Sequence, residues 1–585
     1  MALSGLAIAV VALLGWIWLT RGFFSAFLNL ICCVAAGAIA FAVWEPIAYM
    51  LLGKIGGNDA LGGTIWAISL GLPFAVAMAL LRAVVDQCCP SNMKFDTVTD
   101  AVGGAACGVG AGIITAGILV ISMGFLRVER TFMGHNPVTF QSNGSLKTDK
   151  GLILPVDTLT SRLYRMLSNG SLSTSTPLAA WYPDLEYVPH SIRLSFGRGK
   201  ARNTINTKDF EVWKRFRVGG EGVSFSDVLR DDWEPQVSQS VSDIDGSPFP
   251  SGSALEGFVL NFQPSSRERS GSVVIGNAQV RLLIEKPGAE PEHRIVHPVS
   301  VISQATSERV GFARFRFNVP DTFITSVGGA SETRMGFEFP VPPGFQAKAL
   351  YVKNTRVVIP PENKPIVYPT AAARDAEIRS GKMFALPVDY DTITPIRTTV
   401  ASIANRTDQE LGIMVSPGLG FTIQRGTERG LTTEDVNVIE GQEVYEIRMF
   451  DKTRGIDRNL RIDQFQTKSD TVIVQISVGG DRPLTWLRKV PVVETTPAPQ
   501  LVDTDGQVYE AIGYIYDEQN RYRTIRFNRS RPIRLMSDLP SMSAQREDQK
   551  MTLIYDVSRG VRLAKFQMGG TVLHEFKPPM NTVDR

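Results

Sequence analysis

Four long apolar stretches fill the first 126 residues, and charged residues become frequent only beyond Arg127. A helix needs about 20 predominantly apolar residues to cross the hydrocarbon core of a bilayer. One such stretch could be a buried core helix, but four in succession favour membrane spans. The pattern predicts membrane helices over residues 2–19, 23–52, 61–85 and 100–126.

The fourth apolar stretch carries Gly104, Gly108 and Gly112, one at every fourth position. Four residues turn an α-helix by roughly 400°, so the three glycines form one nearly straight groove. In lipid, helices associate through the close approach of their backbones across small residues. We therefore predict that this glycine zipper is the face through which the fourth helix packs against another helix.

Period-two alternation of apolar and polar residues dominates the chain beyond residue 250, where helical patterns are scarce. The clearest example has Phe312, Phe315 and Phe317 with Arg314 and Arg316 between them. Turn residues separate several such segments, which is typical of strands. We predict a mainly-β soluble part built as antiparallel β-sandwiches.

Two proline-bearing linkers, near residues 360–375 and 490–500, indicate domain boundaries within the soluble part. The predicted domains are a four-helix membrane domain (1–126), a mixed connecting region (127–230) with a short helix at 156–168, a β-sandwich-like domain (231–360), a β-rich domain (375–490) and a second β-rich domain (500–585).

An internal repeat supports this division, because residues 335–344 align without gaps to residues 551–560. Apolar residues match at alternate positions, and the two segments end at Gly344 and Gly560. The shared pattern is a strand, a glycine turn and a second strand. We therefore predict that 500–585 partly repeats 231–360, that the two units fold separately, and that both glycines occupy turns with special backbone angles.

The loop charges bear on orientation. Arg21 follows the first apolar stretch, and Arg82 and Lys94 lie between the third and fourth, so the positive-inside rule places both loops in the cytoplasm. Arg127 and Arg130 argue for the opposite orientation. All five cysteines precede residue 108, which suits a soluble part in an oxidising compartment. We expect a multi-pass inner-membrane protein with its C-terminal domain extracytoplasmic.

The stretch LTRGFFSAFLNLICCVAAGAIAFAVWEPIAYMLL resembles the first loop and second helix of the colicin V production (CvpA-like) membrane protein family. That family places Arg-Gly at the end of its first helix, matched by Arg21 and Gly22. Its fourth helix opens with an Asp followed by glycines at intervals of four, matched by Asp100 and the glycine zipper. The resemblance covers residues 1–126.

The chain departs from this family at charged positions. Ala101 and Ala111 stand where the family has arginines, and Ser25 and Ala26 occupy a region that is often acidic. The resemblance implies an inner-membrane protein linked to envelope stress tolerance or to toxin and colicin production. Some relatives carry an extracytoplasmic serine protease domain, which implies an outside location for the soluble part.

No motif of known chemistry emerges from residue spacing. The chain lacks the Gly-x-Ser-Gly-Gly setting of a trypsin-like nucleophile, and Gly271–Ser272 reads as a turn. Its five histidines are scattered and none forms a helical HExxH pair, so a structural role is favoured over a metal site. We predict no catalytic, cofactor-binding or metal-binding residues and no enzyme activity. A net charge of only +3 argues against nucleic-acid binding.

Two groups of charged residues have both a structural and a functional interpretation. Ionisable residues in lipid are functional by default, but Asp100 is expected to cap the fourth helix. Basic residues gather between positions 198 and 217, and this basic cluster comprises Arg198, Lys200, Arg202, Lys208, Lys214, Arg215 and Arg217. We expect it to be a solvated face; the alternative is that it binds anionic lipid headgroups or a cell-wall polymer.

These observations favour an envelope protein that presents a β-rich domain for binding or scaffolding. The expected partners are the lipid bilayer, further copies of the chain or other envelope proteins, and a cell-wall polymer. Two alternatives remain open, a transport or secretion component that forms an oligomeric pore and a peripheral hydrolase.

Overall fold

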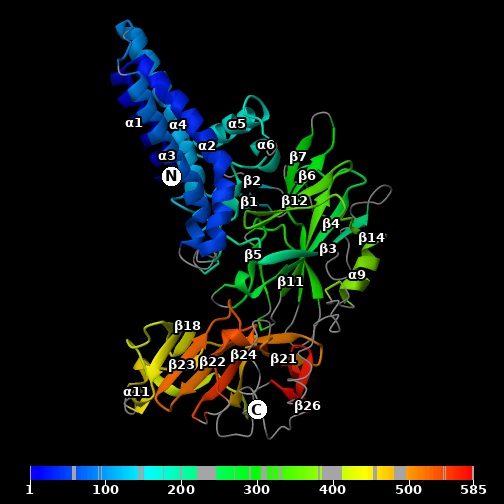
Figure 1. Ribbon diagram of the computed structural model, residues 1–585. Coiled ribbons are helices and arrows are strands. Elements are labelled where there is room, and N and C mark those ends of the chain that lie inside the picture. Colours follow the sequence, from blue (N-terminus) through cyan, green and yellow to red (C-terminus); the bar gives the residue numbers. More distant parts are fainter. Residues whose placement is uncertain are drawn as a thin grey trace.

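The computed structural model separates a helical module at one end of the molecule from two β units (Figure 1). It describes residues 2–55, 61–89, 91–93, 95–136, 138–141, 146–147, 151–174, 177–194, 196–197, 201–219, 246–268, 271–288, 291–304, 312–320, 322–326, 328–329, 333–379, 383–384, 412–451, 457–479, 496–543, 546 and 548–582.

The predicted membrane helices are confirmed as four helices long and apolar enough to cross a bilayer. They are α1 (Ala2–Arg21), α2 (Phe23–Ile55), α3 (Ile65–Cys88) and α4 (Thr97–Gly124). At 1.5 Å per residue, the 33 residues of α2 extend roughly 50 Å, well beyond a hydrocarbon core of about 30 Å. A helix of this length therefore extends beyond such a core at one end or at both.

The helices form a row in which α4 packs between α1 and α2, and α3 packs against α2. A Cβ atom added at Gly104 would lie 2.5 Å from the carbonyl oxygen of Trp18. At Gly108 it would lie 2.9 Å from the Leu14 carbonyl oxygen, and at Gly112 it would lie 2.9 Å from a backbone atom of α1. The glycine zipper thus lies against α1, so its packing partner is a helix of the same chain.

Replacing Gly108 with Leu should push α1 and α4 apart, because the new side chain would overlap the backbone of α1. We expect the free energy of unfolding of the full chain in mild detergent to fall by about 1–3 kcal/mol, the usual range for overpacking. The matched control is Gly5→Leu on α1, where an added Cβ meets no atom within 4 Å. Equal thermal stability of the two variants would contradict this packing role.

The connecting region holds short elements that lie beside the helices. They are β1 (Thr139–Phe140), β2 (Leu146–Lys147), α5 (Val156–Asn169), α6 (Leu178–Trp181) and α7 (Val188–Ser191). The helix predicted at 156–168 is therefore confirmed as α5. Tyr164 and Thr160 of α5 donate hydrogen bonds to backbone carbonyls of α2 and α4, respectively, which fixes α5 along their sides.

The first β unit is a sandwich of a six-stranded sheet, in the order β14-β3-β4-β11-β8-β9, and a four-stranded sheet, in the order β13-β12-β6-β7. Its core joins Phe258 and Phe337 of the larger sheet to Leu282 and Leu350 of the smaller one. A pair of short strands, β5 and β10, completes the unit. The bounds are β3 Phe210–Gly219, β4 Ala254–Phe262, β5 Val274–Gly276, β6 Val280–Lys286, β7 Glu292–Val296, β8 Ser300–Gln304, β9 Phe312–Arg316, β10 Phe323–Thr325, β11 Thr333–Val341, β12 Gln346–Val352, β13 Thr355–Val358 and β14 Ile366–Tyr368.

The predicted limits of this domain, 231–360, are too narrow at both ends. β3 lies in the predicted connecting region, yet it pairs with β4 along its whole length. Beyond residue 360, β14 pairs with β3 in parallel, and helix α9 (Ala371–Arg379) contacts the same sheet. The proline-bearing segment is thus an internal crossover, because its chain returns to cover the sheet edge.

The second β unit is built on one twelve-stranded sheet. Its bounds are β15 Gly412–Val415, β16 Gly418–Gln424, β17 Leu431–Glu434, β18 Asn437–Glu446, β19 Arg461–Phe465, β20 Thr471–Gly479, β21 Pro499–Asp503, β22 Val508–Glu518, β23 Tyr522–Phe527, β24 Lys550–Ser558, β25 Arg562–Met568 and β26 Thr571–Asn581. Helix α11 (Arg448–Asp451) follows β18.

Dividing this unit into domains 375–490 and 500–585 is wrong, because β20 pairs with β24 and β18 pairs with β23 across the proposed boundary. β20 shows why the two segments need each other. Val472, Val474 and Ile476 face one core and Ile473 faces the other. A strand that is apolar on both faces must be covered on both, and strands from both segments supply the cover.

The repeated segments do share a turn, since Gly344 and Gly560 have φ angles of +81° and +85°. These angles confirm the predicted glycine turns. The turn is not a hairpin, however, because β11 pairs with β4 and β8 whereas β12 pairs with β6 and β13. Likewise β24 pairs with β20 and β22, and β25 pairs with β21 and β26. The repeat is therefore a corner at which the chain leaves one set of strands for another.

Candidate functional site

The C-terminal part of α2 meets the first β unit in a group of side chains that we call the juxtamembrane cluster: Glu45, Tyr49, Trp181, Tyr182 and Arg356. Glu45 Oε2 lies 3.0 Å from a guanidinium nitrogen of Arg356, on β13. The hydroxyls of Tyr49 and Tyr182 donate to Glu45 Oε1 at 2.9 and 3.2 Å. The guanidinium also lies 4.1 Å from the centre of the Trp181 ring. A carboxylate in the C-terminal third of an apolar helix is thus held by Arg356 of the β unit, by Tyr182 of the connecting segment and by Tyr49 of its own helix.

The protonation state of Tyr182 favours its hydrogen bond to Glu45. Burial, together with the adjacent Glu45 carboxylate, raises the pKa of Tyr182 far above its ordinary value, so its hydroxyl stays a donor. The Tyr49 hydroxyl has a double role, because it also accepts the backbone N–H of Arg356 at 3.0 Å. The cluster therefore links helix and sandwich by both side-chain and main-chain hydrogen bonds.

A buried segment at residues 201–206 caps the helix ends at this side of the module. Asn203 Nδ2 donates to the Phe125 carbonyl at 2.7 Å, just beyond α4, and Asn206 Nδ2 donates to the Leu52 carbonyl of α2 at 3.0 Å. Helix ends leave carbonyl groups without intrahelical partners, and burying them unpaired is unfavourable. The connecting chain supplies those partners, so the helices end inside the protein rather than in an open linker.

We expect Glu45→Ala to destabilise the full chain, because it leaves the Arg356 guanidinium and two tyrosine hydroxyls without their acceptor. The loss should be about 2–3 kcal/mol, the upper part of the range for hydrogen bonds to charged groups. Glu292→Ala is the matched control, since Glu292 forms a half-exposed pair with Arg294, and such pairs contribute about 1 kcal/mol or less. Thermal unfolding in detergent compares them, and equal losses would contradict the role of the cluster.

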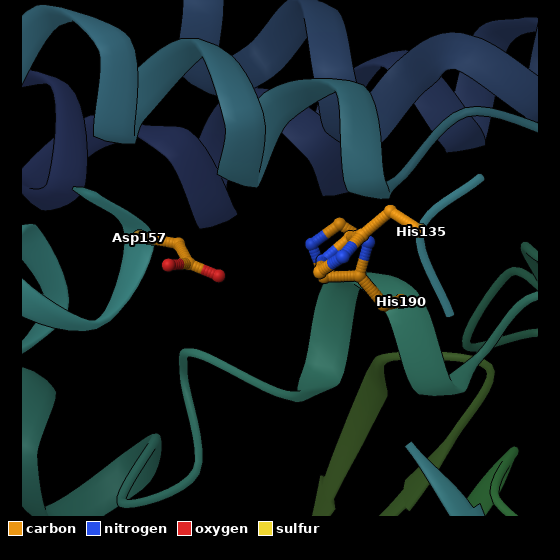
Figure 2. A group of neighbouring side chains, drawn as sticks. All are labelled: His135, Asp157 and His190. Atoms are coloured by element: carbon orange, nitrogen blue, oxygen red, sulfur yellow. The ribbon is translucent and has the colours of Figure 1, made fainter. Parts of the chain in front are cut away.

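Two histidines and a carboxylate gather beside the end of α4. Figure 2 shows Asp157, in the first turn of α5, pointing toward the rings of His135 and His190. All three residues are buried, and one potential ligand atom from each lies within 4.8 Å of the others. The two rings meet edge to face, with their centres 5.2 Å apart. Sequence reasoning treated these histidines as scattered and missed the group, because no local spacing links residue 135 to residue 190.

Histidine nitrogens and a carboxylate oxygen are ligands that Zn²⁺ accepts, but this group does not fit a metal ion. The Arg193 guanidinium donates to His190 Nδ1. A guanidinium can only donate, so Nδ1 holds the lone pair and Nε2 carries the proton of the neutral ring. A metal on Nε2 would require the opposite arrangement, and the Arg193 charge would also repel it. We therefore interpret the group as a buried polar contact between the connecting region and the helices.

Burial and the nearby Arg193 charge shift both histidines toward the neutral form. They lower the pKa of His135 to about 4 and the pKa of His190 well below its ordinary value. Burial also raises the pKa of Asp157. Both histidine rings are therefore neutral at neutral pH.

The histidine pair predicts acid sensitivity. Histidines of the unfolded chain titrate near pH 6.5, whereas His135 in the fold titrates near pH 4. Between these values the unfolded chain binds more protons, so the free energy of unfolding falls as the pH is lowered. His135→Gln should reduce that fall by up to about 3 kcal/mol. Unfolding of the full chain at stepped pH measures this, and parallel curves for both proteins would refute it.

Arg21, Gly22 and Asp100, which carry the family resemblance, meet at the opposite end of the helices. Asp100 Oδ1 accepts the backbone N–H of Phe23, the first residue of α2, at 3.1 Å. Its other oxygen accepts the N–H of Phe95 at 3.1 Å. Gly22, with φ +89°, forms the turn between α1 and α2 beside this carboxylate. One side chain thus ties the α1–α2 turn to the loop before α4.

The expectation that Asp100 caps the fourth helix is therefore corrected. The N-cap of α4 is Asp96, whose side chain accepts the Thr99 N–H at 3.0 Å. Asp100 instead satisfies an N–H at the start of α2. Sequence reasoning missed this because the bond joins residues 77 positions apart.

Of the described members of the predicted basic cluster, Arg202, Arg215 and Arg217 pair with acidic groups, whereas Lys208 is exposed, as expected of a solvated face. Arg215 and Arg217 of β3 both pair with Glu256 of β4, at 3.1 and 3.5 Å, and the buried Arg202 pairs with Asp209 at 3.5 Å. These three arginines are therefore paired within the protein and are not free to bind lipid headgroups or a cell-wall polymer. Arg198 and Lys200 lie outside the described residues.

Charged groups also join the two β units. Lys468 of the second unit contacts Ser272 Oγ of the first, and burial lowers the pKa of Lys468 to about 8. A serine beside a lysine can act as nucleophile and base in hydrolases. Ser272 is buried between the units, however, and a nucleophile must be reached by its substrate. The neighbouring Asp470 of the second unit accepts the N–H of Gly328 at 2.9 Å, so this region serves as an interface.

The chain matches no protein-family model, and neither a curated protein nor a solved structure is similar enough to be matched.

Proposed function

We propose that the chain is a multi-pass protein of the bacterial inner membrane that holds a β-rich part in a fixed position outside the membrane, for binding or scaffolding in the cell envelope. The juxtamembrane cluster carries this proposal. An anchor that only tethers a domain can end in a flexible linker. Here Glu45 pairs with Arg356 of the β unit, and the carbonyl groups at the helix ends are bonded by the segment that leads into that unit. Such a junction transmits position and orientation.

The arrangement of the β units supports a presenting role. The first sandwich lies beside the helices, and the second unit extends away from them (Figure 1). The polar interface between the units includes the contacts of Lys468 and Asp470. Partners suited to this part are other envelope proteins, further copies of the chain or a cell-wall polymer.

We also propose membership of the CvpA-like family, with a role in envelope stress tolerance or toxin production. The support is the turn at which Gly22 lies beside Asp100, since residues that define the resemblance from two separate segments meet there. The replaced charges limit the analogy. Ser25 accepts a hydrogen bond from Arg82 at 3.1 Å where the family often has an acidic residue.

The proposed orientation rests on charge. Arg21 and Arg82 lie toward the end of the helices opposite the juxtamembrane cluster, so the positive-inside rule favours a cytoplasmic location for that end. Lys94, which supported the same orientation, lies outside the described residues. The β units contain no cysteine, as suits an oxidising compartment.

Reporter fusions test this orientation. Alkaline phosphatase fused after Arg585 should be active, and a fluorescent protein that matures only in the cytoplasm should stay dark at the same position. Fusions after Met93, at the opposite end of the helices, are the control and should show the reverse. Fluorescence without phosphatase activity after Arg585 would overturn the orientation. Ion currents from the purified full chain in a planar bilayer would instead favour the oligomeric pore.

A further inference from the structure

Helix α5 and its flanks expose large apolar side chains on their outer surface. Ile153, Leu159, Met166 and Leu172 have exposed fractions of 74, 42, 65 and 47%. Leu159 and Met166 are seven residues apart, two helical turns, and therefore share one face. Exposed apolar side chains gathered on one helix face are unusual on a water-soluble protein and mark an interaction site. We call these four residues the α5 patch.

This patch is not a misplaced core face, because the inner face of α5 is already used. Val156, Thr160 and Tyr164 are buried against the helical module. Thr160 Oγ1 donates to the Ile113 carbonyl of α4 at 3.2 Å. Helix α5 is therefore covered on one side by protein and presents its apolar residues on the other.

The position of α5 along the module indicates what covers the patch. Tyr164 donates to the Val34 carbonyl of α2 at 3.1 Å, in the first half of that helix. Figure 1 shows α5 beside α2 and α4, partway along the helices rather than beyond their ends. A hydrocarbon core spans about 20 helical residues, so a core that begins near Phe23 includes the level of Val34.

The neighbouring surface at this level is also apolar. Ile31 and Ile39 of α2 flank Val34 in sequence and are exposed, as is Leu119 of α4. Exposed apolar side chains on helices of membrane-spanning length and composition suit contact with acyl chains. The α5 patch continues this apolar surface outward from the spanning helices.

One exposed charge accompanies the patch. Arg162 lies on the outer face of α5 between Leu159 and Met166. Arginine side chains near a membrane boundary extend toward the headgroups while their stems stay among apolar groups. An exposed arginine bordered by apolar side chains matches a phospholipid boundary, with an acidic phosphate next to acyl chains.

We propose that α5 is an interfacial helix embedded in the leaflet on the β-unit side, with the α5 patch against acyl chains and Arg162 against headgroup phosphates. The inference rests on the proposed membrane location of α1–α4 and goes beyond it by assigning a fifth lipid-contacting helix. It places α5 within that leaflet, with the Arg162 side chain extending toward the membrane boundary and the juxtamembrane cluster outside the hydrocarbon core.

Methionine oxidation tests the patch directly. The full chain in phospholipid nanodiscs is treated with a water-soluble oxidant, and mass spectrometry follows Met166 and Met414. Their exposed fractions in the fold are 65% and 48%, so without lipid contact Met166 should be oxidised at least as fast. We expect Met166 to react several-fold more slowly. Equal rates, or a faster Met166, would overturn the proposal.

Lipids that carry a photoreactive group in the acyl chain identify what protects Met166. Cross-links within residues 151–172 are expected, and protection without such cross-links would overturn the proposal in favour of contact with a second copy. Labelling of α3 is the internal reference, because Leu72 and Leu80 are exposed there. Labelled α3 with unlabelled α5 rejects only this inference, whereas failure at both sites rejects the membrane location itself.

The proposed contact of Arg162 with phosphates is tested in nanodiscs rich in phosphatidylglycerol. Arg162→Glu should lower the cross-linking yield within residues 151–172, because the new carboxylate is repelled by the phosphates. Arg448→Glu on α11, an exposed site in the second β unit, is the matched control and should leave that yield unchanged. An undiminished yield for Arg162→Glu would remove the headgroup contact from the proposal.

Discussion

The ion pair between Glu45 and Arg356 is the contact on which the relation between the helices and the β units depends. An apolar helix end could meet a protein domain in many orientations, because apolar contacts are not directional. A carboxylate held by a guanidinium and two tyrosine hydroxyls accepts only a narrow range of geometries. The capping of Phe125 and Leu52 by the chain at 201–206 adds further directional bonds at the same junction. Polar bonds therefore fix the orientation of the helices relative to the β units, whereas apolar side chains fill the cores.

Local sequence patterns predicted the elements well and the long-range contacts poorly. Apolar length identified α1–α4, and glycine spacing identified the packing face, because both depend on periodicity within one helix. Alternation identified the strands, and Gly344 and Gly560 marked real turns. The domain division failed because proline-rich segments look alike whether they separate domains or lie within one. Strand pairing distinguishes a linker between domains from a loop within one. β20 pairs with β24 across the segment 490–500, so that segment lies within one unit.

The candidate sites show the same limit more sharply. The sequence predicts that Asp100 caps the fourth helix, but the N–H groups that it accepts belong to Phe23 of α2 and to Phe95 in the loop before α4. His135 and His190 are 55 residues apart in the sequence, and the fold brings the loop after α4 and helix α7 together beside Arg193. The exposed fractions of the α5 patch depend on which face of α5 the helical module covers. A residue type and its neighbours predict what a side chain can do, whereas the fold decides which group it meets.

The junction between α2 and the β unit can form only late in synthesis. Tyr49 and Arg356 are 307 residues apart along the chain, so the ribosome completes α2 long before β13 exists. During that interval the described protein partner of Glu45 is Tyr49 of the same helix, so water must satisfy its remaining acceptor sites, which its place in the C-terminal third of a long helix permits. The helical module can thus insert first, and closing so long a loop costs only slightly more entropy than closing a short one. Formation of β13 then supplies the Arg356 contacts that α2 lacks until that point.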